Sequence, residues 1–504
     1  MSDQAMDHEI TTEYENQTGL STNCEVGNAE DISTLAETGA GDPTDESFAP
    51  PVQDKWVRRL SNTIVAHITD SDVSVLATAA MMLFILAPGI MALMAMCMRS
   101  IDFTMVVYLR MIKNWIFPCA CSMILVIYVT DILRIKLAGE RLSDHIRKNP
   151  VWAIFAGAVF LMINSQLYNG LFYAIMGYSS AALGETFGME VGYFVFILYG
   201  AAKISRESHK KLIFRSHIIV SLILVAVAFV LWNTQIESNF FYDWSPRFSS
   251  IFSNINYYGY YLAVSIPIAG AAFVCEEKKS WKAAALISFI INTIALSIND
   301  TFGSWFGAAF GVLFIAITHH ILEKKANRQA LVLIPIFILF LFIPGHVIGN
   351  FETNFSELFG DVSRIVNGDI DGSLGSGRMD ILIESSKIVG ENWTLGIGFE
   401  GVEYLEYEGA PYNTRPHNEF LQYALFHGVL MAVLYFAGCL GVFIRALLKK
   451  EKLSAATLVS LCGAFGYLVS SFFGITVFST TVYLFIFLGM GYVRDAAEPV
   501  SEIV

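Results

Sequence analysis

Lysine and arginine are absent from the first 54 residues, which hold 13 of the 45 acidic residues of the chain. This stretch also has no periodic apolar residues with which to build a core, a pattern typical of disorder. It has no basic segment ahead of an apolar one, so we do not expect it to act as a signal peptide. The sequence predicts a disordered acidic tail over residues 1–54. Most of the net charge of −13 belongs to this tail.

Cysteine is scarce, and the longest polar stretch outside the tail, residues 351–422, has none. The chain has seven cysteines, and most lie in apolar runs: Cys97, Cys119, Cys121, Cys275, Cys439 and Cys462. Scattered cysteines in such surroundings favour small buried core residues over a disulfide framework or a metal site. We therefore expect no bound metal and no cofactor.

Long hydrophobic runs dominate the rest of the chain. Hydrophobic residues make up 55% of the sequence, and the mean hydropathy is +0.54, which indicates a polytopic membrane protein. About twelve windows are long enough to cross a bilayer. They fall near residues 75–98, 115–133, 151–168, 187–202, 212–232, 257–274, 281–298, 302–318, 330–347, 420–445, 455–473 and 477–493. The predicted fold class is an all-α membrane protein with about twelve transmembrane helices.

Basic residues follow every second one of these windows. Clusters of Lys and Arg occur at residues 134–148, 203–215, 278–282, 324–328 and 445–452. Because cytoplasmic loops carry an excess of Lys and Arg, we expect these clusters and both chain termini on the cytoplasmic side. The first connection is discordant, since Arg99, Arg110 and Lys113 also lie there.

The expected organisation places one large extracytoplasmic loop between spans nine and ten. Residues 55–350 would form the first nine spans, residues 351–417 the loop, and residues 418–504 the last three spans with a short tail. Connections of this length are uncommon and usually either functional or disordered. This one retains aromatic and aliphatic residues, so we expect it to be folded and to carry the function.

His417 is the ionisable residue of greatest interest in this region. It follows Pro416 and precedes Asn418, a residue type that favours the N-cap of a helix. A helix N-terminus favours the neutral imidazole, which can accept a proton from a sugar hydroxyl as a general base. The alternative is an interfacial histidine that merely helps to cap the helix. The residues alone leave both interpretations open.

Three arginines are expected on the outer face: Arg247, Arg378 and Arg415. Guanidinium groups can bind phosphate in a two-pronged fashion, and a helix start adds backbone donors. Arg378 stands where such a helix is expected to begin. The alternative is pairing with nearby acids such as Asp380 or Glu384. Sequence reasoning does not decide between these roles.

Two further polar positions lie at predicted outer turns. Asp300, between the seventh and eighth spans, could orient an acceptor or pair with an arginine, or it could belong to an ordinary polar turn. Asn254, where the sixth span begins, is a candidate acceptor contact or helix cap, as is Asn418.

Three stretches together resemble the O-antigen ligase and polymerase family of bacterial envelope glycosyltransferases. Arg247 and the Asn254-Ile255-Asn256 element are similar to the family's arginine followed by Asn-Pro-Asn, with isoleucine in place of proline. Ser376-Gly377-Arg378, followed by Gly396-Ile397-Gly398, resembles its Ser-Gly-Arg and Gly-Gly block. His417-Asn418 with Gly428 resembles its His-Asn and Gly block. The resemblance covers roughly residues 190–495.

The resemblance implies a bundle similar to the C-type glycosyltransferase fold, in the lipid bilayer of the bacterial cytoplasmic membrane. Members transfer a glycan, without a metal, from an undecaprenyl diphosphate carrier to an acceptor sugar or another envelope acceptor. Carried over by position, Arg378 would bind the diphosphate and His417 would be the essential histidine. Arg247 or Arg415 would supply a second phosphate contact. Other polysaccharide assembly proteins are expected partners, and nucleic acid is not.

The chain also departs from the family pattern. Residues 299–304 lack the arginine that many members have at the start of the eighth span, and Phe426 stands where an acid is often found. Polymerisation of a surface polysaccharide is the reaction we favour, and ligation of a finished glycan remains open. A polysaccharide or lipid transporter is the rival class. No internal repeat is evident and the polar residues gather at the outer face, which disfavours a transporter.

Overall fold

The computed structural model describes residues 68–98, 107–108, 110–137, 149–175, 187–233, 248–252, 254–323, 327–348, 351–369, 374–375, 378–399, 401, 406–407, 410–411, 415–450 and 453–493. The predicted acidic tail and Arg247 lie outside these residues. So do Ser376 and Gly377 of the Ser-Gly-Arg motif.

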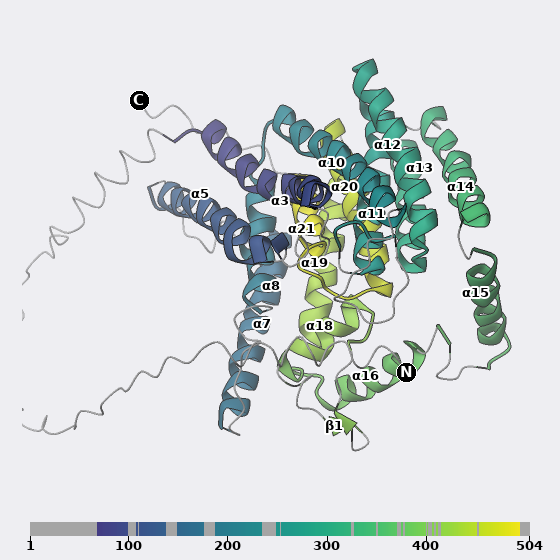
Figure 1. Ribbon diagram of the computed structural model, residues 1–504. Helices are drawn as coiled ribbons and strands as arrows, with labels where there is room; N and C mark the ends of the chain where they lie inside the picture. The colour runs from purple at the N-terminus through teal and green to yellow at the C-terminus, as the bar shows by residue number, and fades with distance from the viewer. Residues whose placement is uncertain are drawn as a thin grey trace, which may run out of the picture. The chain divides into compact units, whose positions relative to one another are not determined.

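Helices make up almost all of the described chain (Figure 1). Their bounds are α3 (Asp70–Met98), α5 (Phe117–Leu137), α7 (Pro150–Ile175), α8 (Gly188–Gly192), α9 (Leu198–Ala202), α10 (Glu207–Asn233), α11 (Ile255–Cys275), α12 (Lys279–Asn299), α13 (Phe302–Glu323), α14 (Arg328–Ile348), α15 (Phe351–Val366), α16 (Arg378–Glu391), α18 (Glu419–His427), α19 (Val429–Leu448), α20 (Ala455–Ser470) and α21 (Thr481–Gly491). Single π-helical turns, η2 (Ile112–Ile116) and η4 (Tyr193–Ile197), precede α5 and α9, and a 3-10 turn, η6 (Ser471–Phe473), follows α20.

Each of the predicted hydrophobic windows coincides with helix in the structure. Within the described residues, 9 helices are long and apolar enough to cross a membrane. Three shorter apolar helices, Gly188–Ala202, Arg328–Pro344 and Thr481–Gly491, cover the other windows. The class of a polytopic helical membrane protein is therefore confirmed. A set of twelve complete spans remains a prediction.

One predicted span is wrong as a continuous helix. The window at residues 420–445 is divided into α18 and α19 at Gly428, where φ is +89°. A Cβ atom at this position would lie 2.2 Å from the Thr394 carbonyl oxygen. The Val429 backbone N–H donates to the Trp393 carbonyl oxygen at 2.9 Å. Only glycine allows this backbone conformation together with so close a neighbour.

The polar stretch after α14 contains its own secondary structure. It carries α15, α16 and a short antiparallel hairpin in which β1 (Glu406–Tyr407) pairs with β2 (Ala410–Pro411). The expectation of a folded stretch here is met for these residues. Its location outside the cytoplasm stays a prediction.

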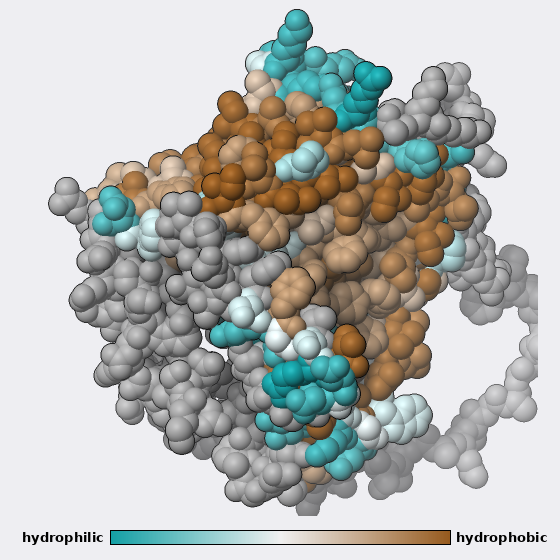
Figure 2. Space-filling model, turned by 90° about the vertical axis from the view of Figure 1, so that its right-hand side faces the viewer, coloured by the Kyte–Doolittle hydropathy of each residue, from teal (hydrophilic) through white to brown (hydrophobic). Residues whose placement is uncertain are grey.

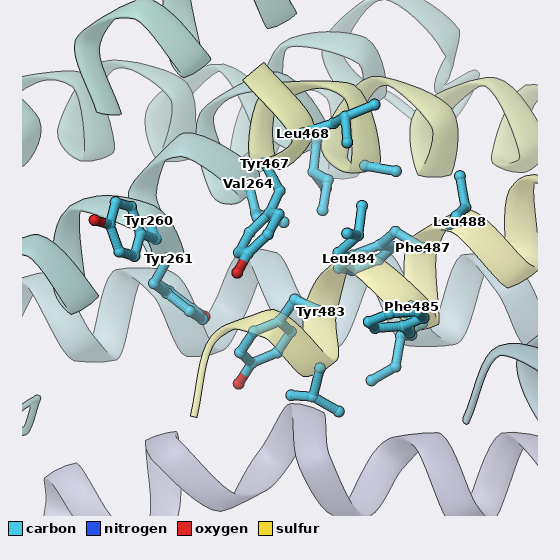
Figure 3. Close-up of a cluster of buried hydrophobic side chains, with 14 of the residues drawn as sticks. Tyr260, Tyr261, Val264, Tyr467, Leu468, Tyr483, Leu484, Phe485, Phe487 and Leu488 are labelled. Atoms are coloured by element: carbon cyan, nitrogen blue, oxygen red, sulfur yellow. The ribbon is translucent and has the colours of Figure 1, made fainter. Parts of the chain in front are cut away.

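The centre of the bundle is α11, which packs against α12, α13 and α20. Of its apolar window, 89% is buried inside the protein. Small residues allow the close approach, since a Cβ atom on Gly466 of α20 would lie 2.3 Å from the Ala263 carbonyl oxygen of α11. Figure 3 shows tyrosine, phenylalanine and leucine side chains from α11, α20 and α21 meeting in this core.

The outward faces of the long helices are apolar. Exposed large hydrophobic residues include Ile90, Phe160, Leu171, Ile287 and Ile343. Figure 2 shows a broad apolar area on one face of the protein, with polar residues above and below it. So large an exposed apolar surface is what a lipid bilayer covers.

Ion pairs connect helix ends that carry the predicted cytoplasmic cations. Arg134, in the last turn of α5, pairs with Asp70 at the start of α3 at 2.6 Å. Arg215 of α10 makes two hydrogen bonds, of 2.7 and 2.8 Å, to the Glu276 carboxylate just after α11. These contacts join α5 to α3, and α10 to the end of α11, through basic residues. The orientation of the protein in the membrane remains a prediction.

Candidate functional site

The start of α18 is fastened to the segment that follows α20. The Asn418 Oδ1 atom caps α18 by accepting from the Leu421 backbone N–H at 2.9 Å. Its Nδ2 atom donates to the Phe472 carbonyl oxygen at 3.1 Å. One side chain thus fixes the beginning of α18 and joins it to residues 471–476. We refer to residues 415–422 and 471–476 as the two site segments.

His417 has an unusual backbone conformation. Its φ is 49°, in the left-handed region, and its side chain is partly buried. A non-glycine residue here carries strain on the order of 1 kcal/mol that the surrounding structure has to hold. The neighbours that hold it are the buried Pro416 and the capping residue Asn418. Backbone strain of this kind is common where a side chain must be aimed for function.

Arg415 and Gln422 join the two site segments further. Arg415 Nη1 donates to the Thr476 carbonyl oxygen at 3.4 Å. The Gln422 side chain donates to Thr476 Oγ1 at 2.5 Å and accepts from the Thr476 backbone N–H at 3.2 Å. Thr476 is therefore held from both sides, and it in turn holds the Arg415 guanidinium at the start of α18.

Tyr260 of α11 relates the position of Arg378 to the second site segment. The Arg378 guanidinium is close enough to the Tyr260 hydroxyl for a Coulombic interaction. A Cβ atom on Gly474, in the second site segment, would lie 2.4 Å from that hydroxyl oxygen. Figure 3 shows the Tyr260 hydroxyl pointing away from the other labelled rings. The structure thus brings Arg378 close to the segments that hold Arg415, His417 and Asn418.

A tight turn after α16 fixes that helix against α18. The Ile397 backbone N–H donates to the Leu425 carbonyl oxygen at 2.8 Å, and φ is +66° at Gly396. A Cβ atom on Gly396 would lie 2.5 Å from the Leu425 oxygen. Ser165 of α7 donates to the Leu395 carbonyl oxygen at 2.5 Å. The Gly-x-Gly motif therefore serves a close packing contact that fixes the chain after the end of α16 against α18 and α7.

An open apolar groove runs along α16 next to Arg378. Its volume is about 450 Å³, and its lining residues are Met379, Leu382, Ile383, Ser386 and Lys387. All five residues come from one helix, and Arg378 directly precedes the first of them.

Asn254 and Asp300 belong to a neighbouring cluster at the start of α11. Asn254 is the N-cap of α11, and its Oδ1 atom accepts from the Asn256 backbone N–H at 2.8 Å. Asp300 ends α12 with φ of 62°. The residue that joins these turns is Asn299, which donates to the carbonyl oxygens of Phe248 and Ile255 at 2.9 and 3.0 Å. Sequence reasoning singled out Asp300 and missed Asn299.

Glu419 is a buried acid that the sequence analysis did not single out. It accepts hydrogen bonds from the hydroxyls of Tyr435 at 2.8 Å and Tyr467 at 3.2 Å. Burial raises the pKa of the Glu419 carboxyl to about 7, and the two tyrosine hydrogen bonds act in the opposite direction. The signal for it was an acid directly after the cap of an apolar helix.

Glu190 and His427 form a second buried polar group that was missed. Glu190 Oε2 and His427 Nε2 are 3.5 Å apart, and both side chains are buried. Both residues lie inside windows that were interpreted only as apolar spans. An ionisable residue within such a window marks a functional position by default, and that was the available signal.

The described residues contain no group of three or more His, Cys, Asp or Glu side chains placed to hold a metal ion. The polar groups of the candidate site are the guanidinium groups of Arg378 and Arg415, the His417 imidazole and the N-termini of α16 and α18. This set can bind an anion and accept a proton.

Residues 287–436 match a family model described as O-antigen ligase. The match runs from α12 into α19 and contains Arg378, Arg415, His417 and Asn418. It does not contain Glu190 or residues 471–476. No curated protein matches the chain significantly.

Proposed function

We propose, on the match of residues 287–436 to the O-antigen ligase family model, that this chain transfers a glycan from an undecaprenyl diphosphate carrier to an acceptor sugar. Glycosyltransfer of the ligase or polymerase type is the activity of the family. The lipid donor, the acceptor and the roles of single residues are our inference for this chain.

The observation that carries the proposal is that Arg415 and His417 lie beside the N-terminus of α18, and that Arg378 lies within electrostatic range of Tyr260, whose hydroxyl packs on the second site segment. Arg415 is held by Thr476, and Arg378 lies at the first position of α16 near Tyr260. Guanidinium groups and helix N-termini are the donors that proteins use for phosphate. A diphosphate would meet both here. The apolar groove along α16 would lie beside it.

The proposed reaction breaks the bond between the anomeric carbon and the diphosphate oxygen. An acceptor hydroxyl attacks that carbon, its proton passes to His417, and the electron pair of the broken bond leaves with the lipid diphosphate. The arginines stabilise the charge that develops on the leaving group, as a preorganised site does. A base and one such donor are each typically worth about two to four powers of ten in rate. We therefore propose a reaction that does not depend on a divalent metal.

The acceptor that we propose is a second carrier-linked glycan, so that the product is a growing surface polysaccharide. The site would face the outer side of the bacterial cytoplasmic membrane, with residues 351–417 outside. Ligation of the finished glycan to an envelope acceptor is the second candidate, favoured by the description of the matching family. Both reactions require the same contacts to the diphosphate of the donor and the same general base.

The direct test uses purified protein in nanodiscs with a synthetic undecaprenyl diphosphate-linked repeat unit. Longer carrier-linked glycans are expected, with and without EDTA. A strict requirement for a divalent ion would contradict the proposed chemistry. In cells, deletion of the gene should leave single repeat units on the carrier. Long chains that accumulate unattached on the carrier would instead identify a ligase.

A further inference from the structure

The buried pair of Glu190 and His427 is a feature that the proposed chemistry does not use. Glu190 lies on α8, and His427 is the last residue of α18. Their relative exposures are 3% and 0%. Among the described residues, Glu190 Oε2 and both ring nitrogens of His427 have no hydrogen-bond partner. The 3.5 Å approach between them is therefore the main polar interaction of the pair.

Aromatic rings enclose the imidazole. Phe187, Phe399 and Tyr423 lie with ring centroids 6.3, 5.4 and 6.4 Å from His427. In such surroundings a single buried charge is costly, whereas a carboxylate beside an imidazolium is neutral as a pair. Removal of one partner leaves the buried charge of the other without a compensating charge. The two residues are thus expected to act as a unit.

The pair is connected to the candidate site through one threonine. Glu190 Oε1 accepts from Thr476 Oγ1 at 3.4 Å. Thr476 is also bound by Gln422 and accepts from Arg415 through its carbonyl oxygen. A continuous set of contacts therefore runs from His427 to the Arg415 guanidinium. Arg415 and Thr476, at the end of this set, belong to the two site segments.

We propose that Glu190 and His427 are positioning residues that hold Thr476, and through it Arg415, in the geometry that binds the diphosphate of the donor. The inference rests on the proposed function. It extends the site beyond the matched residues 287–436, because Glu190 and Thr476 lie outside them. It also gives the α8 segment, which is short for a membrane span, a role at the site.

The test measures binding of undecaprenyl diphosphate, without a glycan, to protein in nanodiscs. Glu190→Gln and His427→Gln should each weaken binding by about tenfold, a coupling that residues in contact commonly show. The double variant should have the same affinity as the single variant that binds more weakly, because the two residues act as a unit. In glycan transfer, the variants should raise KM for the donor more than they lower kcat.

Thr476→Val is the second variant, since it leaves the buried pair intact and removes only the hydroxyl group that Glu190 and Gln422 contact. It should show the same weakened binding, without a further loss when combined with Glu190→Gln. His217→Gln is the matched control. His217 is also fully buried, but its Nε2 contacts Ser265 Oγ at 2.9 Å in the core of the bundle. This control should bind the carrier as the wild type does.

Wild-type affinity in the Glu190, His427 and Thr476 variants would overturn the positioning role and leave the proposed function standing. An equal loss in His217→Gln would also overturn it, because the effect would then reflect a general packing defect. A wild-type protein that does not bind undecaprenyl diphosphate would overturn the proposed function together with this inference.

Discussion

Asn418 donates a hydrogen bond to the Phe472 carbonyl oxygen at 3.1 Å while its own Oδ1 atom caps α18. These two roles use different ends of one amide. The cap needs only an acceptor, whereas the link to Phe472 needs the NH₂ group as a donor. The two roles can therefore be separated by substitution.

Asn418→Asp should retain the cap and lose the link, and Asn418→Ala should lose both. We expect the alanine variant to lose about 1 kcal/mol of stability, the usual value of such a cap. The aspartate variant should melt close to the wild type and bind the donor more weakly, because the 471–476 segment is released and a negative charge is added. Thermal unfolding in detergent and donor binding in nanodiscs measure the two effects. Equal melting temperatures for the wild type and both variants would show that the Asn418 cap does not contribute to stability.

His417→Gly should separate catalysis from capping. Glycine adopts a φ of 49° without strain, so this variant should be at least as stable as the wild type. Turnover should nevertheless fall by about 10²- to 10⁴-fold, because the proposed base is lost while donor binding is retained. His320, exposed in the last turn of α13, provides the control His320→Gly. Full activity of His417→Gly would return the histidine to a structural role.

Arg378→Ala should weaken donor binding as well as turnover, because the diphosphate is charged before and during the reaction. Arg378→Lys should rescue only part of the loss, since a point charge does not reproduce a two-pronged contact. The control is Arg364→Ala on α15, whose guanidinium pairs with Asp369 at 3.3 Å. Donor titration of the three variants tests this. Complete rescue by lysine would point to simple charge attraction.

The carboxyl of Glu419 should make stability depend on pH. Its pKa in the folded protein, about 7, lies above the value of 4.5 for a free glutamate side chain. The folded state therefore binds the proton more tightly, and the stability that this provides is present at low pH and lost as pH rises towards and through 7. Glu419→Gln, which has no proton to lose, should flatten this dependence. Melting temperatures of both proteins between pH 5 and pH 8 measure it; parallel curves would contradict the assignment.

Cysteine labelling tests the topology. In a cysteine-free background, Ser363→Cys on α15 should react with a membrane-impermeant maleimide in whole cells, and Gln329→Cys should not. Both positions are exposed on the protein surface, so accessibility within the fold does not distinguish them. The expectation follows from the distribution of basic residues. Reversed labelling would place the α15 segment in the cytoplasm.

The helices within the predicted spans could be identified from sequence because each lies in a long apolar window, and the windows needed no tertiary information. The break at Gly428 could not, since it depends on the approach of residues 393–395 from a distant part of the chain. The pairing of Glu190 with His427 could not be predicted from the sequence for a related reason. They are over 200 positions apart, and each looked like an isolated polar residue in an apolar run. Motifs identified Arg378 and His417, whereas Thr476, which contacts Arg415, Gln422 and Glu190, carries no motif.

The contacts of the turn after α16 also affect where the chain can accept insertions. Between Asn392 and Phe399, backbone contacts to α18 and α7 leave no room for added residues without moving Arg378 relative to His417. The β1–β2 hairpin lies farther along, and its paired residues Glu406 and Pro411 are neighbours across the ladder. Residues added at the hairpin tip would leave both ends of the connection in place. Insertions between β1 and β2 are therefore expected to be tolerated better than insertions between Asn392 and Phe399.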